Sequence, residues 1–250
     1  MQTGQTLLTG RNLSKQFKGL LAVSGVDIEI SQGEIVGLIG PNGAGKSTTF
    51  NLLSGFLRPT TGSLRIGGAD MAKTATPEHI SKLGLVRTFQ HGSYLPSMSV
   101  RDNVLIGCLG GIRSGRVRAA DQDQAIEHAI GIFGLAGHQD DIAGNLPHGL
   151  QRLLSMAIAF AARPTLICFD EPLTGLNQTE VAETLEVYRK LKSEYAMSIL
   201  LVEHNMRAVM NICDRIYVLH HGEIIFTGTP DAVKASEVVL KAYLGEAHDI

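Results

Sequence analysis

The hydrophobic positions of this chain fall into short apolar runs separated by segments with helical spacing. Short runs that end at glycine or polar turn residues predict β-strands. The predicted strands cover residues 7–13, 23–30, 34–39, 85–88, 165–169, 198–202 and 215–219. Several of these runs contain almost no polar residue, which indicates strands covered on both faces and therefore a parallel sheet between helices.

Helical spacing is clearest over residues 178–195, where apolar side chains recur every three or four positions. A second helix is predicted over residues 149–162, and a third follows a glycine-rich turn and reaches Leu53. The alternation of strands and helices predicts an α/β fold with a mainly parallel sheet.

The segment 90–145 has a different character, with predicted helices near residues 100–108 and 121–133 and no predicted strand. We therefore expect a helical subdomain inserted into the α/β core. Residues 110–118, which read GGIRSGRVR, predict a mobile loop within this subdomain because glycine and arginine dominate them.

The composition restricts the classes of partner. The 250 residues carry 22 Lys and Arg against 24 Asp and Glu, and 44% are hydrophobic. This is ordinary globular composition rather than that of a disordered chain. A net charge of -2 provides no overall attraction to nucleic acid or anionic lipid, so we expect no nucleic-acid partner.

Three features bear on the cellular compartment. The longest apolar stretch, residues 153–162, is much shorter than the roughly 20 residues that cross a bilayer. The first ten residues lack the basic and apolar regions of a signal peptide. The three cysteines are odd in number and far apart, which favours a reducing compartment over a disulfide framework. These features predict a cytoplasmic location.

A phosphate-binding motif lies between the predicted strand 34–39 and the helix that follows it. It reads G-x-x-x-x-G-K-S and consists of Gly40, Pro41, Asn42, Gly43, Ala44, Gly45, Lys46 and Ser47. The glycines let backbone N–H groups surround a polyphosphate at a helix N-terminus. The lysine neutralises phosphate charge and the serine hydroxyl binds Mg²⁺. With the adjacent Thr48, the motif predicts a site for ATP and Mg²⁺.

Two carboxylates follow a distant apolar run. Asp170 and Glu171 come directly after residues 166–169, at the strand edge where open α/β sheets bind ligands. Asp170 is predicted to hold Mg²⁺ through water, and Glu171 to polarise the attacking water as general base. The alternative is that the pair only caps the next helix. The Lys46 motif favours the catalytic interpretation, because phosphate-loop enzymes need such an aspartate.

These motifs and their order resemble the ATP-binding subunit of ABC transporters, over essentially the whole chain. The resemblance implies a single ATPase domain, residues 1–250, with a P-loop core and an N-terminal antiparallel β subdomain. Residues 1–89 and 146–250 would form the P-loop and β core, and residues 90–145 the helical subdomain that ends at the signature segment.

The resemblance implies roles for three further residues. Phe17 would stack on adenine, although it could instead be a core aromatic beside a strand. Gln90, which follows the run VRTF, corresponds to the glutamine that touches Mg²⁺ and water and senses the membrane partner. His204 corresponds to the switch histidine at the γ-phosphate. The expected catalytic residues are therefore Glu171, His204 and Gln90. The expected metal ligands are Ser47, Gln90 and Asp170.

Two segments depart from the family pattern. The family's D-loop ends in aspartate, whereas residues 174–177 of this chain end in Asn177. The signature segment normally reads Leu-Ser-Gly-Gly-Gln and contacts ATP on the partner subunit. The contact residues implied here are Leu146, Pro147, His148, Gly149 and Leu150. Pro147 has neither a hydroxyl nor an N–H, so only Gly149 and the following helix N-terminus would remain as donors.

Several stretches are most similar to the ATPases of branched-chain or hydrophobic amino acid importers. They are GLIGPNGAGKSTTFNLLSGFLRPTTG, VRTFQ, LPHGLQRLL and the C-terminal VLKAYLGE. This resemblance implies a second ATPase subunit, either a related chain or a second copy. It also implies two membrane permeases, a periplasmic solute-binding protein, and a peripheral location on the cytoplasmic face of a bacterial inner membrane.

Three alternatives share part of these motifs. An exporter ATPase for lipid or lipopolysaccharide would carry the same set. A soluble ABC ATPase acting on nucleic acid or ribosomes would need long heptad insertions, a second ATPase unit or a basic stripe, which this sequence lacks. A P-loop kinase would need an acceptor site and normally no switch histidine.

Overall fold

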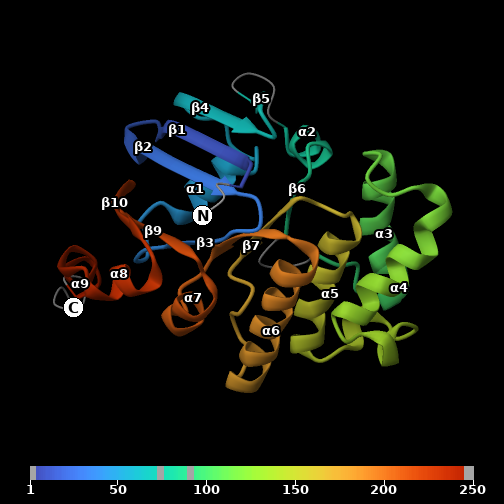
Figure 1. Cartoon of the computed structure of the whole chain (residues 1–250). Helices are drawn as coiled ribbons and strands as arrows, with labels where there is room; N and C mark the ends of the chain where they lie inside the picture. The colour runs from blue at the N-terminus through green and yellow to red at the C-terminus, as the bar shows by residue number, and fades with distance from the viewer. Residues whose placement is uncertain (1–3, 72–75, 89–92, 245–250) are drawn as a thin grey trace.

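The computed structural model describes residues 4–71, 76–88 and 93–244. Two sheets organise them (Figure 1). The first is antiparallel, with the order β2-β1-β4-β5. Its strands are β1 (Thr6–Phe17), β2 (Leu20–Ser31), β4 (Thr61–Ile66) and β5 (Ala69–Asp70). The antiparallel N-terminal β subdomain implied by the resemblance is therefore confirmed.

The second sheet has the order β10-β9-β3-β8-β7-β6 and forms the centre of the molecule. Its strands are β3 (Ile35–Ile39), β6 (Leu85–Arg87), β7 (Leu166–Asp170), β8 (Ser198–Val202), β9 (Arg215–His220) and β10 (Glu223–Gly228). All its neighbouring strands pair in parallel except β9 and β10. Because the strands are parallel, the chain leaves β3, β6, β7, β8 and β9 at one edge of the sheet.

Helices cover the sheets and form one end of the molecule. They are α1 (Lys46–Leu53), α2 (Pro77–Lys82), α3 (Val100–Arg113), α4 (Gln122–Ile132), α5 (His148–Ala161), α6 (Gln178–Tyr195), α7 (Met206–Ile212), α8 (Pro230–Ala235) and α9 (Glu237–Leu244). Short 3-10 turns occur at Ala119–Asp121, Ala136–His138 and Ala143–Asn145. No helix among the described residues combines the length and apolar character needed to cross a membrane.

The central sheet is buried on both faces, as its uninterrupted apolar runs predicted. In β7, Ile167 and Phe169 join a core shared with α5 and α6, whereas Leu166 and Cys168 face a second core shared with α1 and the antiparallel sheet. This alternation follows from the two-residue period of a strand. Figure 1 shows α5, α6 and α7 on one side of the sheet and the antiparallel sheet on the other.

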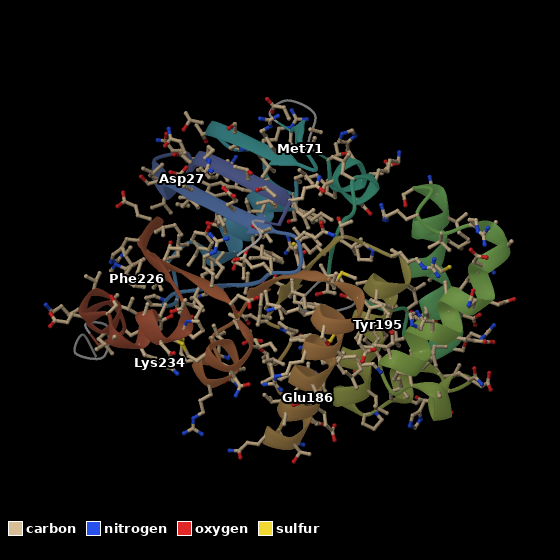
Figure 2. All side chains as sticks on the ribbon, viewed as in Figure 1. Asp27, Met71, Glu186, Tyr195, Phe226 and Lys234 are labelled. Carbon is tan, nitrogen blue, oxygen red and sulfur yellow. The ribbon has the colours of Figure 1, made fainter. Side chains whose placement is uncertain are left out.

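The inserted helical subdomain is also confirmed, and it packs on the core through α5. Phe160 of α5 contacts the ring of Tyr195 of α6 edge-on at 5.3 Å between centroids. His128 of α4 lies 5.3 Å from the same tyrosine. Figure 2 shows Tyr195 at this junction of α5 and α6.

The prediction of a mobile loop over residues 110–118 is wrong for residues 110–113, because α3 continues through Arg113, whereas residues 114–118 form the turn that follows the helix. Gly111 in this segment and Gly107 just before it allow α3 to pack closely. A Cβ at Gly107 would lie 1.9 Å from the carbonyl oxygen of Ile158, and one at Gly111 would lie 3.0 Å from that of Ala162. The following turn is anchored by Arg116, whose guanidinium donates to Ser81 O at 2.7 Å and Ala162 O at 3.0 Å.

Candidate nucleotide and hydrolysis site

The phosphate loop, residues 40–47, connects β3 to α1 at the carboxyl edge of the central sheet. Three of its glycines have positive φ angles, 155° at Gly40, 78° at Gly43 and 99° at Gly45. A Cβ would lie 2.1 Å from Leu219 O at Gly40 and 2.6 Å from Ala22 O at Gly45. Glycine is therefore required at these two positions on both conformational and steric grounds.

A cavity of about 580 Å³ opens over this loop. The predicted nucleotide contacts that line it are Phe17, Asn42, Gly43, Ala44, Gly45, Lys46, Ser47 and Thr48. Glu171 also lines it, so the structure brings a predicted hydrolytic residue to the predicted phosphate site. Gly40 and Pro41 are absent from the lining, and their carbonyl groups instead accept hydrogen bonds from Lys46 Nζ at 2.7 and 2.8 Å.

The cavity also contains residues that the sequence did not indicate. They are Leu20, Leu21, Ala22, His221 and Gly222. Gly222 belongs to the turn between β9 and β10, and its N–H donates to Ala44 O at 2.9 Å. Because β9 pairs with β3, the turn after β9 lies beside the phosphate loop. No local motif marks these residues, since only the strand pairing brings them here.

Asp170 ends β7 and forms an ion pair with Arg87 at the end of β6. Arg87 Nη2 donates to Asp170 Oδ2 at 2.9 Å, and the two side chains are only 11% and 13% exposed. Burial raises the pKa of the Asp170 carboxyl, and the charge of Arg87 opposes this rise. No role for Arg87 was predicted from the sequence, although it lies three positions before Gln90.

Arg87 also connects this carboxylate to the helix that follows the phosphate loop. Its Nη1 donates to Ser54 Oγ at 3.0 Å, at the end of α1. Its guanidinium lies 4.4 Å from the ring centroid of Phe50 and 4.9 Å from that of Phe56. The planar guanidinium can stack and donate at once, which lysine could not do.

Glu171 follows in a left-handed backbone conformation, with φ of 47°. Its N–H donates to Val202 O at 2.9 Å, which ties the residue to the end of β8. His204, two residues beyond β8, has its Nδ1 at 4.0 Å from Glu171 Oε2. The His204 side chain is 58% exposed. The structure therefore brings together Glu171 and His204, which are distant in the chain, with the histidine open to a ligand.

Glu203 is a buried carboxylate that the sequence analysis did not single out. Its side chain is fully buried. It accepts hydrogen bonds from the backbone N–H groups of Leu173 at 2.8 Å and His204 at 3.1 Å. We call Asp170, Glu171, Glu203 and His204 the carboxylate–histidine cluster. Gln90 lies outside the described residues.

The signature segment lies away from this cavity. None of Leu146, Pro147, His148, Gly149 and Leu150 is among the residues that line it. Pro147 is the N-cap of α5 and makes no side-chain capping bond. The segment contacts the D-loop and the helix after it, because a Cβ at Gly175 would lie 3.1 Å from the His148 ring and one at Gly149 would lie 2.6 Å from Glu180 Oε1.

Asn177, which replaces the family's aspartate, is the N-cap of α6. Its side-chain oxygen accepts from the N–H groups of Thr179 at 2.9 Å and Glu180 at 3.0 Å, and its own N–H donates to Glu180 Oε2 at 2.8 Å. This reciprocal capping box needs an acceptor oxygen but no charge. The replacement therefore preserves the start of the helix.

The comparisons with known proteins agree with this geometry. The model of the ABC transporter family matches residues 23–174. A second model, described as branched-chain amino acid ATP-binding cassette transporter, matches residues 223–249. The chain is 39% identical to the high-affinity branched-chain amino acid transport ATP-binding protein LivG of Escherichia coli (strain K12), over 97% of this chain and 99% of that protein.

Two further similarities extend the comparison. The chain is 33% identical to the lipopolysaccharide export system ATP-binding protein LptB of Haemophilus influenzae, over 96% of this chain and 98% of that protein. The crystal structure of the ADP conformation of MJ1267, an ATP-binding cassette of an ABC transporter, matches with a TM-score of 0.86 and 29% identity, over 96% of this chain and 99% of that one. The chain belongs to the ATP-binding proteins of the ABC transporter family, which are ATPases that couple ATP hydrolysis to transport.

Proposed function

We propose that this chain powers the uptake of branched-chain or other hydrophobic amino acids. The observation that carries the choice of solute is the similarity of residues 223–249 to a segment of branched-chain amino acid transporters. This segment supplies β10, the edge strand of the central sheet, and the helices α8 and α9. The role in the printed name of LivG, high-affinity branched-chain amino acid transport, supports the same solute class.

ATP would bind across the cavity over the phosphate loop. The backbone N–H groups of residues 42–48 and the N-terminus of α1 would hold the phosphates. Lys46 Nζ would exchange its bonds to the Gly40 and Pro41 carbonyl groups for bonds to phosphate oxygens. Phe17 is 42% exposed at the cavity, which leaves its ring available to stack on adenine.

The residues at this edge also fit Mg²⁺, because Ser47 and Asp170 offer hard oxygen donors. When bound, Mg²⁺ would neutralise charge that develops on the phosphates. We assign the proton of the attacking water to Glu171, since its carboxylate lines the cavity. His204 would contact the γ-phosphate, and Gln90 would contact Mg²⁺ and water. Loss of one general base typically lowers the rate roughly 10²- to 10⁴-fold.

A second ATPase subunit would complete each site with its segment 146–150. The absence of this segment from the cavity lining of its own chain supports that arrangement. The single domain of residues 1–250 would divide as expected, with residues 90–145 as the helical subdomain. Two permeases and a periplasmic binding protein would complete the importer, which would hold this chain at the cytoplasmic face of the membrane.

The test is leucine uptake by cells that lack this chain. Deletion should abolish high-affinity uptake of radiolabelled leucine, and the wild-type gene should restore it. A Lys46→Ala gene expressed at the same level should not, because that variant lacks the phosphate-binding ammonium. Unchanged leucine uptake in the deletion strain would contradict the proposed solute class.

Export of lipopolysaccharide is the second candidate, and the similarity to LptB favours it. The same deletion strain separates the two. An importer subunit would leave the outer-membrane lipopolysaccharide content unchanged. An exporter subunit would deplete it while leucine uptake stayed normal.

A further inference from the structure

Glu203 stands out because it is a fully buried carboxylate that the nucleotide site does not require. Burying a charge is unfavourable unless hydrogen bonds compensate it. Here three backbone N–H groups do so, those of Leu173 at 2.8 Å, His204 at 3.1 Å and Asn205 at 3.3 Å. Burial raises the pKa of Glu203, and these backbone donors oppose the rise.

The three donors belong to two different loops. Leu173 follows β7 and lies two positions after Glu171, whereas His204 and Asn205 follow β8. The Glu203 carboxylate therefore connects the loop that carries the proposed general base to the loop that carries the proposed switch histidine. A role limited to the start of α7 would explain the bonds to residues 204 and 205 but not the bond to Leu173.

Both residues that Glu203 connects need such support. Glu171 has a φ of 47°, a conformation that is unfavourable for a residue with a side chain and persists only where the surroundings enforce it. Its own N–H bond to Val202 O fixes one side, and the bond from Leu173 to Glu203 fixes the chain two residues later.

The His204 side chain has little direct support. Its Nδ1 lies 4.0 Å from Glu171 Oε2 and 4.0 Å from Glu203 Oε2, beyond the range of a hydrogen bond. The position of the imidazole therefore depends on the backbone of residue 204, and Glu203 holds that backbone. The Glu203 side chain is fully buried and is not among the residues that line the cavity over the phosphate loop.

We infer that Glu203 is a positioning residue for ATP hydrolysis, whose carboxylate sets the separation between Glu171 and His204. This inference rests on the proposed function, because both residues must act in turnover. Glu203 does not touch the nucleotide in this arrangement. Its loss should therefore lower kcat and leave the affinity for ATP unchanged, since small displacements of catalytic groups affect the rate far more than binding.

The experiment compares Glu203→Ala and Glu203→Gln with the wild-type chain, each in the assembled transporter with its partner subunits. We expect Glu203→Ala to lower kcat roughly 10- to 100-fold. Glu203→Gln should recover part of the rate, because its carbonyl oxygen can still accept from Leu173. The KM for ATP and the affinity for a fluorescent ATP analogue should stay within about twofold of wild type in both variants.

Glu34→Gln is the matched control. The Glu34 carboxylate also accepts a hydrogen bond from a backbone N–H, that of Ser31 at 3.0 Å. It forms an ion pair with Arg215 at 2.8 Å. It precedes β3 and so lies at the opposite edge of the sheet. This variant should retain the wild-type kcat, which shows that losing a half-buried carboxylate does not by itself reduce turnover.

A double-mutant cycle with His204→Ala separates positioning from general stability. If Glu203 acts through the histidine and the base, adding Glu203→Ala to His204→Ala should lower kcat much less than it does in the wild-type background. Fully additive losses, a wild-type kcat in Glu203→Ala, or a parallel loss of kcat and ATP affinity would overturn the inference. An assembled transporter with the wild-type chain that binds ATP but does not hydrolyse it would instead overturn the proposed function, and the inference with it.

Discussion

The phosphate loop and the carboxylate–histidine cluster lie at the same edge of the central sheet, but they are built by different means. The loop is eight consecutive residues whose glycines and helix N-terminus fix its shape. The cluster takes Asp170 and Glu171 from the end of β7 and Glu203 and His204 from the end of β8. Local backbone conformation forms the phosphate loop, whereas the pairing of β7 with β8 forms the carboxylate–histidine cluster. Binding should therefore depend on the loop and turnover on the cluster.

The largest effect should come from Glu171→Gln, which removes the proposed base without changing its size. We expect kcat to fall roughly 10²- to 10⁴-fold, because no other carboxylate among the described residues lines the cavity. ATP affinity should be retained, and ATP should hold the subunits in a stable dimer visible by gel filtration. Glu78→Gln, on the exposed surface of α2, is the control. Normal hydrolysis by Glu171→Gln would refute the assignment.

Arg87→Met tests the side chain that connects Asp170 of the cluster to α1, the helix that follows the phosphate loop. The substitution leaves the Asp170 carboxylate nearly buried without its cation, and breaking a buried pair costs about 3–5 kcal/mol of unfolding free energy. Urea unfolding measures this loss. Adding Asp170→Asn to the Arg87→Met variant should restore part of the stability, because the uncompensated charge is gone. If the double variant is no more stable than Arg87→Met, the ion pair is not the source of the loss.

Lys46→Ala tests the loop itself. A hydrogen bond to a charged group contributes roughly 1.5–3 kcal/mol, so ATP affinity should fall roughly 10- to 100-fold. Isothermal titration with ATP measures the change. Lys82→Ala, whose side chain pairs with Glu78 on the surface, should bind ATP as wild type does. A Lys46→Ala variant with normal affinity and slow turnover would show that the lysine belongs functionally to the cluster.

The same contrast explains what the sequence could predict. The phosphate loop could be predicted from the sequence, because its eight positions are consecutive and each residue type has a local reason. Asp170 and Glu171 could be predicted as well, because they follow an apolar run, whereas His204 was predicted only from the resemblance to the family's switch histidine. Arg87 and Glu203 were missed because their partners Asp170 and Leu173 lie 83 and 30 positions away in the chain. Their roles exist only after β6, β7 and β8 have paired.

The helical subdomain shows a second physical reason why a prediction from sequence can be wrong. Glycine in residues 110–118 predicted flexibility, but Gly111 lies on the same face of α3 as Gly107, where the helix passes close to the end of α5. A glycine that permits close backbone approach and one that permits a turn look the same in a sequence. Only the neighbouring helix decides between them, and the chain supplies that helix some 40 positions later.

Pro147→Ser should produce a smaller effect, because it restores a hydroxyl to the signature segment without altering the cluster. Serine is a favourable N-cap and could contribute about 1 kcal/mol to α5, which the lost rigidity of proline would offset by about 0.4–1 kcal/mol. The melting temperature should therefore change little. ATP turnover at saturating ATP should rise a few-fold. Unchanged turnover in the assembled transporter would mean that the proline does not weaken the site.

The smallest expected effect is on the pH dependence of stability. The contributions of the buried Glu203 and the exposed Glu78 to the free energy of unfolding should change with pH in opposite directions. Burial raises the pKa of Glu203, so its contribution to the free energy of unfolding is greatest below its unfolded value near pH 4. That contribution is lost as the pH rises through the folded pKa. Glutamine does not titrate, so the stability of Glu203→Gln relative to wild type should improve from about pH 4 toward neutrality.

Glu78 provides the opposite case for the same measurement. Its hydrogen bond to Lys82 lowers its pKa, so its contribution is present above about pH 4 and is lost as the pH falls through the folded pKa. Glu78→Gln should therefore lose stability relative to wild type as the pH rises from acid values to about pH 4, and this difference should stay constant from there to neutrality. Urea unfolding of Glu78→Gln below about pH 4 and of Glu203→Gln from about pH 4 to neutrality gives the two slopes. If stability relative to wild type changes with pH in the same direction for both variants, burial does not raise the pKa of Glu203. The buried cluster and the surface would then not differ at this residue.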